Sequence, residues 1–272
     1  MNDGSLEVRD VTVRFGGLTA LDSVSLTAAP NQVTGIIGPN GAGKTTLLNV
    51  LCGFVPPDSG SVLFGGRDLT RLRPHQLAGV GIARTLQGVG LFGGLSVAEN
   101  VMVGASRHAR AGFLSGVLGL PRSDRDERQL RERAMTALEL VGVADHAPAL
   151  PGALAYGVRK RVALARALVA EPRLLLLDEP ASGLSEQELP ELGTLLGRLA
   201  ATITMVVIEH RMDLMMSLCH SIVVLDFGKV IATGPPAAVQ EDPAVTAAYL
   251  GIAESDVAAE DELTAAGERD EQ

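Results

Sequence analysis

The residues from Gly38 to Thr45 read GPNGAGKT and match the pattern G-x-x-x-x-G-K-[ST]. A continuous aliphatic run, residues 33–37, precedes them, and a helical pattern begins at Lys44. Glycines let such a loop curl until several backbone N–H groups point at one phosphate, and the helix start adds its positive dipole end. The lysine offers a charge to the β- and γ-phosphates, and the threonine offers a hydroxyl to Mg²⁺. The loop therefore predicts a nucleotide site built from Gly38, Pro39, Asn40, Gly41, Ala42, Gly43, Lys44, Thr45 and Thr46.

Two acidic residues, Asp178 and Glu179, end a second aliphatic run that consists of four leucines, residues 174–177. A buried strand delivers such residues to its carboxyl end, where ligands bind in open α/β sheets. We predict that Asp178 holds the Mg²⁺ shell and that Glu179 polarises the water that attacks the γ-phosphate. A general base of this kind contributes roughly 10²–10⁴ in rate. The pair therefore predicts hydrolysis as well as binding, whereas the plain alternative is a strand that ends in solvated acids.

The elements that must position these residues follow from the hydrophobic pattern. Residues 6–13 and 23–28 alternate as antiparallel strands do, whereas residues 33–37, 174–177 and 204–208 are apolar throughout, as in strands covered on both faces. Helical patterns follow the last three runs at residues 44–52, 186–199 and 212–218, and residues 222–226 and 229–233 predict a hairpin. Ser185 and Glu188 form a capping-box pattern for the second helix, in which Pro190 is expected to cost a backbone bond. The alternation predicts an α/β fold with a mostly parallel core sheet and an antiparallel β edge lobe.

The middle of the chain, from about residue 74 to residue 170, is mainly helical in pattern, with one short strand at residues 82–85. Ser96 and Glu99 form another capping-box pattern. After Ser123, an amphipathic helix presents Leu130, Ala134, Leu138 and Val141 on one face. The apolar piece 111–120 is too short to span a membrane, and it fits either a packed helix or a membrane-facing surface. We predict a helical lobe inserted into the α/β core.

Charge divides the chain of 272 residues into two parts. Residues 253–272 hold eight acidic residues against Arg269, so they carry −7 of the net charge of −9. We therefore predict a folded domain at residues 1–252 and an acidic, disordered tail at residues 253–272.

The sequence has no basic face of the kind that binds nucleic acid. Cys52 and Cys219 match no metal-ligand or redox spacing. With no secretory signal and no apolar run of about 18–20 residues, we expect a cytosolic chain.

Taken together, these motifs resemble the ATP-binding subunits of ABC transporters, and the resemblance extends from Leu6 to Gly251. It implies a P-loop NTPase ABC cassette that hydrolyses ATP with Mg²⁺. In the sequence RTLQ, Gln87 resembles the Q-loop glutamine, which contacts Mg²⁺ or water. His210, at the end of VVIEH, resembles the switch histidine at the γ-phosphate, and Phe15 resembles the aromatic that stacks on adenine. Residues 181–185 (ASGLS) resemble the D-loop, which lines the dimer seam.

Finer features, among them RFGGL at residues 14–18 and AAYLG at residues 247–251, resemble the branched-chain amino-acid uptake group. The resemblance implies a second, different ATP-binding subunit, two membrane permeases and an extracytoplasmic solute-binding protein as partners. It places the chain at the cytoplasmic face of the membrane. A related urea or amide importer shares nearly all of these features.

One motif departs from the family. The signature, usually LSGGQ or LAYGQ, here reads Leu154, Ala155, Tyr156, Gly157 and Val158. In the family this segment acts in trans on ATP held by the partner subunit, through backbone N–H groups and a helix, here expected at residues 159–170. A hydrogen bond to a charged group contributes about 1.5–3 kcal/mol. The missing serine and glutamine therefore predict that the site closed by Val158 is slower than the site built on Lys44.

Three other classes of nucleotide-binding protein are alternatives to this interpretation. A soluble ABC ATPase of translation or repair normally carries tandem cassettes or a long coiled-coil insert, and this chain has neither. A GTPase needs an N-K-x-D motif, which is absent from the sequence. A regulatory subunit that binds ATP with weak hydrolysis stays open as an alternative, although Glu179 and His210 argue against it.

Overall fold

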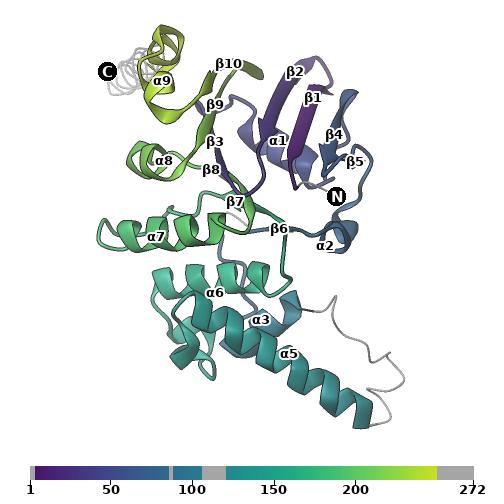
Figure 1. Ribbon diagram of the computed structural model, residues 1–272, viewed down its shortest axis with the longest axis vertical. Coiled ribbons are helices and arrows are strands. Elements are labelled where there is room, and N and C mark those ends of the chain that lie inside the picture. The colour runs from purple at the N-terminus through teal and green to yellow at the C-terminus, as the bar shows by residue number, and fades with distance from the viewer. Residues whose placement is uncertain (1–3, 86–87, 106–120, 250–272) are drawn as a thin grey trace, which may run out of the picture.

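Six strands form the main sheet of the molecule (Figure 1), and the computed structural model describes residues 4–85, 88–105 and 121–249. In sheet order the strands are β10 (Lys229–Gly234), β9 (Ser221–Asp226), β3 (Val33–Ile37), β8 (Thr204–Ile208), β7 (Leu174–Asp178) and β6 (Ile82–Arg84). All neighbouring pairs are parallel except β10 with β9. The prediction of a mostly parallel core sheet is confirmed. Gln87, the segment 111–120 and the acidic tail lie outside the described residues.

Every residue of β3, β7 and β8 is buried, because both faces of the sheet are covered. Successive residues of β7 alternate between two cores: Leu174 and Leu176 face one, and Leu175 and Leu177 face the other. The first core contains residues of helices α1 (Lys44–Leu51) and α2 (Leu77–Val80) and of a second sheet, and the second core contains residues of the remaining helices. The candidate functional side chains at the strand ends are therefore carried by a sheet that is packed on both faces.

The second sheet is antiparallel throughout, with the order β2 (Leu18–Ala28), β1 (Leu6–Phe15), β4 (Ser59–Phe64) and β5 (Arg67–Asp68). It forms the predicted edge lobe, and Figure 1 shows α1 between this lobe and the main sheet. Strand β2 begins five residues before the predicted start at Ser23. The tight turn at Gly16 and Gly17 explains the difference, because it pairs Phe15 with Leu18 and so extends the hairpin.

The inserted lobe, drawn below the sheet in Figure 1, consists of helices α3 (Val97–Gly104), α5 (Pro121–Leu140) and α6 (Tyr156–Leu168), which contact one another. A short helix α2 (Leu77–Val80) and 3-10 turns at Pro74–Gln76, Ala144–His146 and Pro151–Ala153 connect it. The capping box of Ser96 and Glu99 is present at α3, as predicted. Ala134 and Leu138 of α5, and Val141 directly after it, are buried in the core shared with α3 and α6. The expected helical lobe is confirmed, although α5 begins at Pro121, a residue suited to a first turn, and not after Ser123.

Helix α7 (Leu189–Ala200) starts later than predicted, and α8 (Met212–Leu218) and α9 (Pro236–Gln240) complete the fold. Glu188 does accept hydrogen bonds from the backbone N–H and the hydroxyl of Ser185, at 2.9 and 2.7 Å. These bonds close a turn ahead of the helix, so the expected helix start at residue 186 is wrong. The later start places Pro190 in the first turn, where its missing N–H has no intrahelical partner to lose. The expected cost of Pro190 is therefore also wrong.

Candidate functional site

The phosphate loop joins β3 to α1 and needs glycine at two of its positions. Gly38 and Gly43 have φ angles of 149° and 100°. A Cβ on Gly38 would lie 2.1 Å from the carbonyl oxygen of Leu225, and one on Gly43 would lie 2.7 Å from that of Ala20. The β1–β2 hairpin, through Ala20, and strand β9, through Leu225, therefore lie directly against the backbone of the loop. Only glycine gives both the required dihedral angles and this close approach.

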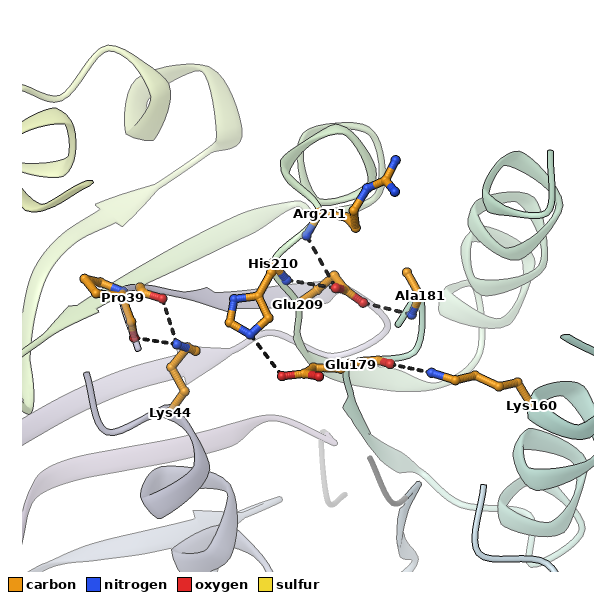
Figure 2. Close-up of polar contacts among 9 residues, drawn as sticks. Pro39, Lys44, Lys160, Glu179, Ala181, Glu209, His210 and Arg211 are labelled. Atoms are coloured by element: carbon orange, nitrogen blue, oxygen red, sulfur yellow. Dashed lines mark hydrogen bonds and ion pairs between the residues drawn. The ribbon is translucent and has the colours of Figure 1, made fainter. Parts of the chain in front are cut away.

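Lys44 is buried inside this loop, and its Nζ donates hydrogen bonds to the carbonyl oxygens of Gly38 and Pro39, at 2.7 and 2.6 Å (Figure 2). Burial lowers the pKa of Lys44, and the nearby charge of Glu179 opposes that shift. The ammonium group is therefore held within the loop, next to the carboxylate expected to act on water. If an ATP phosphate bound at this position, its oxygens would replace the two carbonyl oxygens as hydrogen-bond acceptors of the Lys44 ammonium group.

A cleft surrounds the loop and brings together segments that are far apart in the sequence. Its walls come from the β1–β2 hairpin, the phosphate loop, the ends of β7 and β8, and the β9–β10 turn. The lining residues are Phe15, Leu18, Thr19, Ala20, Asn40, Gly41, Ala42, Gly43, Lys44, Thr45, Thr46, Glu179, Ile208, His210, Phe227 and Gly228. Phe15 is 52% exposed and Phe227 is 86% exposed. Phe227 was missed by the sequence analysis, which treated its turn only as a hairpin connection.

Glu179 and His210 both line the cleft and contact each other (Figure 2). His210 Nε2 lies 2.9 Å from Glu179 Oε1, and the Glu179 side chain is 19% exposed. Glu179 has a φ angle of 47°, which is unfavourable for a residue with a side chain. Its backbone N–H donates to the carbonyl oxygen of Ile208 at 2.8 Å. The two side chains predicted to act on the γ-phosphate and on water are thus in contact.

Asp178 is buried and forms an ion pair that the sequence analysis did not foresee. Arg84 donates to Asp178 Oδ2 at 2.9 Å and, through its other terminal nitrogen, to Asn49 Oδ1 at 2.9 Å. The sequence signal for Arg84 was its place in RTLQ, where only the glutamine was assigned a role. The ion pair holds the carboxylate near the phosphate loop, since Asn49 lies on α1.

The described residues contain no group of three or more His, Cys, Asp or Glu side chains that could hold a metal ion by themselves. A site with so few protein ligands fits a metal that binds together with a nucleotide, because Mg²⁺ is usually bound by one or two carboxylates together with phosphate oxygens. Thr45, which lines the cleft, and Asp178 are the candidate protein ligands.

Lys160 and Glu209 hold the backbone around Glu179 and were also missed. Lys160 Nζ donates to the carbonyl oxygens of Glu179 and Pro180, at 2.7 and 3.2 Å. Burial lowers the pKa of Lys160, and the carboxylate of Glu209 is the first of the charges that oppose this shift. Glu209 accepts the backbone N–H of Ala181 at 2.8 Å. The sequence showed a lysine near the signature and an acid before a histidine, but their burial depends on long-range packing.

The signature segment lies away from the cleft. Helix α6 begins at Tyr156 and not at residue 159, so Gly157 and Val158 belong to its first turn. Tyr156 packs on Gly183, where an added Cβ would lie 2.6 Å from its ring. Of the described residues that line the cleft, none belongs to segment 154–158. Val158 is half-buried and packs against the core.

Comparisons with known proteins show which family the chain is similar to. A family model described as "ABC transporter" matches residues 21–182. The chain belongs to the ABC transporter family. A second model, described as "Branched-chain amino acid ATP-binding cassette transporter", matches residues 229–254. The predicted family membership and fold class are confirmed, and the chain is an ATP-binding, ATP-hydrolysing subunit of that family.

Two curated relatives are similar along nearly the whole chain. The high-affinity branched-chain amino acid transport ATP-binding protein BraF of Pseudomonas aeruginosa is 41% identical, over 91% of this chain and 98% of its own length. The corresponding protein LivG of Escherichia coli is 39% identical, over 93% of this chain and 100% of its own length.

Solved ATP-binding cassettes have the same fold. The ADP conformation of MJ1267, an ATP-binding cassette of an ABC transporter, superposes with a TM-score of 0.78 at 31% identity, covering 91% of this chain and 99% of that one. The dimeric post-hydrolysis state of the cassette MJ0796, bound to ADP and Pi, gives 0.71 at 26% identity, covering 85% and 98%. Within the ranges that the structure describes, no helix is long and apolar enough to cross a membrane.

Proposed function

We propose that this chain powers the uptake of branched-chain or other amino acids, as one of two ATPase subunits attached to membrane permeases at the cytoplasmic face of the membrane. The match of residues 229–254 to the branched-chain family model and the two curated relatives support this solute class. The same matches support a cassette that occupies residues 1–252, followed by the acidic tail. A urea or amide importer is the alternative that the site itself does not distinguish.

The contact of 2.9 Å between Glu179 and His210, at the edge of a cleft lined by the phosphate loop, carries the catalytic part of the proposal. Phe15 would stack on the adenine at the outer end of the cleft, and Lys44 with the loop N–H groups would bind the β- and γ-phosphates. Mg²⁺, held by Thr45 and Asp178 with Gln87 as a further proposed ligand, would neutralise the charge that spreads over the phosphates.

In this arrangement Glu179 orients the attacking water and accepts its proton at a carboxylate oxygen. His210 already points its Nε2 at that carboxylate, and it would turn toward the γ-phosphate once nucleotide fills the cleft. The ion pair with Arg84 keeps Asp178 beside the phosphate loop without bringing it into the proton transfer. The function of the chain thus depends on side chains that strands β7 and β8 place next to each other.

We further propose that the signature of this chain closes the ATP site of the partner subunit, while the partner's signature closes the site at Lys44. Val158 leaves only backbone groups and the start of α6 to face the partner's nucleotide. The two sites of the dimer would therefore turn over at different rates.

A thermal-shift screen tests the transport assignment. The solute-binding protein encoded with this subunit is purified and mixed with leucine, isoleucine, valine, other amino acids and urea. Stabilisation by the branched-chain amino acids is expected. Stabilisation by urea alone supports the alternative importer, and stabilisation by none of these solutes contradicts the assignment. Phosphate release from the assembled complex separates an active ATPase from a regulatory subunit.

A further inference from the structure

Glu209 is a buried carboxylate that faces away from the nucleotide cleft. It directly follows β8, it is 2% exposed, and it does not belong to the set of residues that line the cleft. Burying a carboxylate is costly unless hydrogen bonds compensate for the lost water. Glu209 therefore needs partners in the protein, and their identity indicates its role.

The two oxygens of Glu209 are divided between two segments of the chain (Figure 2). Oε2 accepts the backbone N–H of Ala181 at 2.8 Å. Oε1 accepts the backbone N–H of His210 at 2.8 Å and lies 3.4 Å from that of Arg211. Ala181 follows β7 and His210 follows β8, which are neighbouring strands. One carboxylate thus joins the loops that leave two adjacent strand ends.

These bonds close a ring of contacts around the catalytic pair. Glu179 touches the His210 ring through its side chain, and Ala181, two residues later, reaches the same carboxylate that holds the His210 backbone. Lys160 holds the carbonyl oxygen of Glu179 from the opposite side. A movement of the loop at Ala181 therefore acts on His210 by two routes, one through Glu179 and one through Glu209.

We propose that Glu209 is a positioning residue that transmits displacement of segment 181–185 to His210. The proposal rests on the proposed function and on the resemblance of segment 181–185 to the D-loop, which in the family lines the seam with the partner subunit. Closure of the dimer would move Ala181, and the Glu209 carboxylate would carry that movement to the backbone of His210. Each subunit would then bring its histidine to the γ-phosphate only when the seam is formed.

The substitution Glu209→Gln tests this coupling with almost no change in size. An amide offers one carbonyl oxygen and one NH₂ group, so it cannot accept hydrogen bonds from both loops. Loss of a hydrogen bond to a charged group predicts a fall in kcat of the assembled transporter of about ten- to a hundredfold. The Kd for a fluorescent ATP analogue is expected to stay within about twofold, because Glu209 lies outside the cleft.

The matched control is Glu99→Gln, since Glu99 also accepts a backbone N–H, that of Ser96 at 2.7 Å, but lies in the helical lobe. This control is expected to keep the parent kcat. Should Glu209→Gln fail to fold, Glu209→Asp keeps the charge and, being one methylene shorter, reaches only one of the two loops. The same loss of kcat is expected for it.

A double-mutant cycle with His210→Ala distinguishes positioning from general stabilisation. If Glu209 acts through His210, Glu209→Gln causes no further loss of kcat in the His210→Ala background. If the two losses multiply, or if Glu209→Gln keeps the parent kcat while His210→Ala is slow, the inference is overturned and the proposed function stands. A parent rate in His210→Ala itself contradicts both the role of His210 and the coupling to it.

Discussion

Lys160→Met tests how the structure holds Glu179, the proposed catalytic glutamate. Lys160 lies on α6, in the turn after the signature, and its Nζ donates to the carbonyl oxygens of Glu179 and Pro180 at 2.7 and 3.2 Å. Methionine keeps most of the aliphatic stem and removes only the ammonium group. The substitution therefore tests the two hydrogen bonds more than the packing of the helix.

The expected size follows from the strain at Glu179. A residue with a side chain at a φ angle of 47° costs about 1–3 kcal/mol, so surrounding contacts must hold it there. A hydrogen bond from a charged donor contributes about 1.5–3 kcal/mol. Loss of that amount shifts the balance between the strained and the relaxed loop by a factor of about 10–100, since 1.4 kcal/mol is tenfold. We expect kcat to fall by up to this factor and the free energy of unfolding to fall by about 1.5–3 kcal/mol.

The assay is phosphate release by the assembled transporter, with urea unfolding of the purified subunit measured in parallel. Lys229→Met is the matched control, because Lys229 forms an exposed ion pair with Asp22 at 3.3 Å, and such pairs contribute about 0–1 kcal/mol. The control is expected to keep the parent kcat. If kcat of Lys160→Met stays within about twofold of the parent, the hydrogen bonds of Lys160 do not hold Glu179 in place for catalysis, whatever the stability of the variant.

Gly43→Ala is expected to abolish binding of a fluorescent ATP analogue, because its Cβ would lie 2.7 Å from the carbonyl oxygen of Ala20; full binding would contradict the loop geometry. Val158→Gln is expected to raise kcat of the assembled transporter, and no change would argue that the departure from the family signature is neutral. Burial raises the pKa of Cys52 to about 11 and of Cys219 to about 12, so neither thiol should react with an alkylating reagent at pH 8 until urea unfolds the chain. Rapid labelling of the folded chain would contradict this low reactivity. In the unfolded chain the two thiols lose their protons near pH 9, so their contribution to the free energy of unfolding is complete below that pH and decreases as the pH rises toward 11–12.

The sequence was sufficient for the parts of the molecule that local patterns determine. The apolar runs at β3, β7 and β8 predicted buried strands, and the glycines at residues 38 and 43 predicted the curled loop between them. These signals are local because burial on both faces needs a continuous apolar run, and a curled backbone needs glycine. The start of α7 was misjudged because the capping-box pair also closes a turn outside a helix.

The contacts around the catalytic pair could not be predicted because they join distant segments. Arg84 and Asp178 are far apart in the sequence, and only the parallel pairing of β6 with β7 brings them to 2.9 Å. From the sequence alone, Glu209 is only a polar residue at the end of a strand. In the structure it is 2% exposed and accepts a hydrogen bond from the backbone N–H of Ala181. Charge and residue type were visible from the start, whereas register and burial required the fold.

Glu179→Gln shows whether Glu179 activates water in a composite ATP site. The amide keeps the size of the side chain and can still contact His210, but it cannot accept a proton from water. We expect the assembled transporter to bind the fluorescent ATP analogue with the parent Kd and to release phosphate about 10²–10⁴ times more slowly. Phosphate release at a rate close to that of the parent would contradict it.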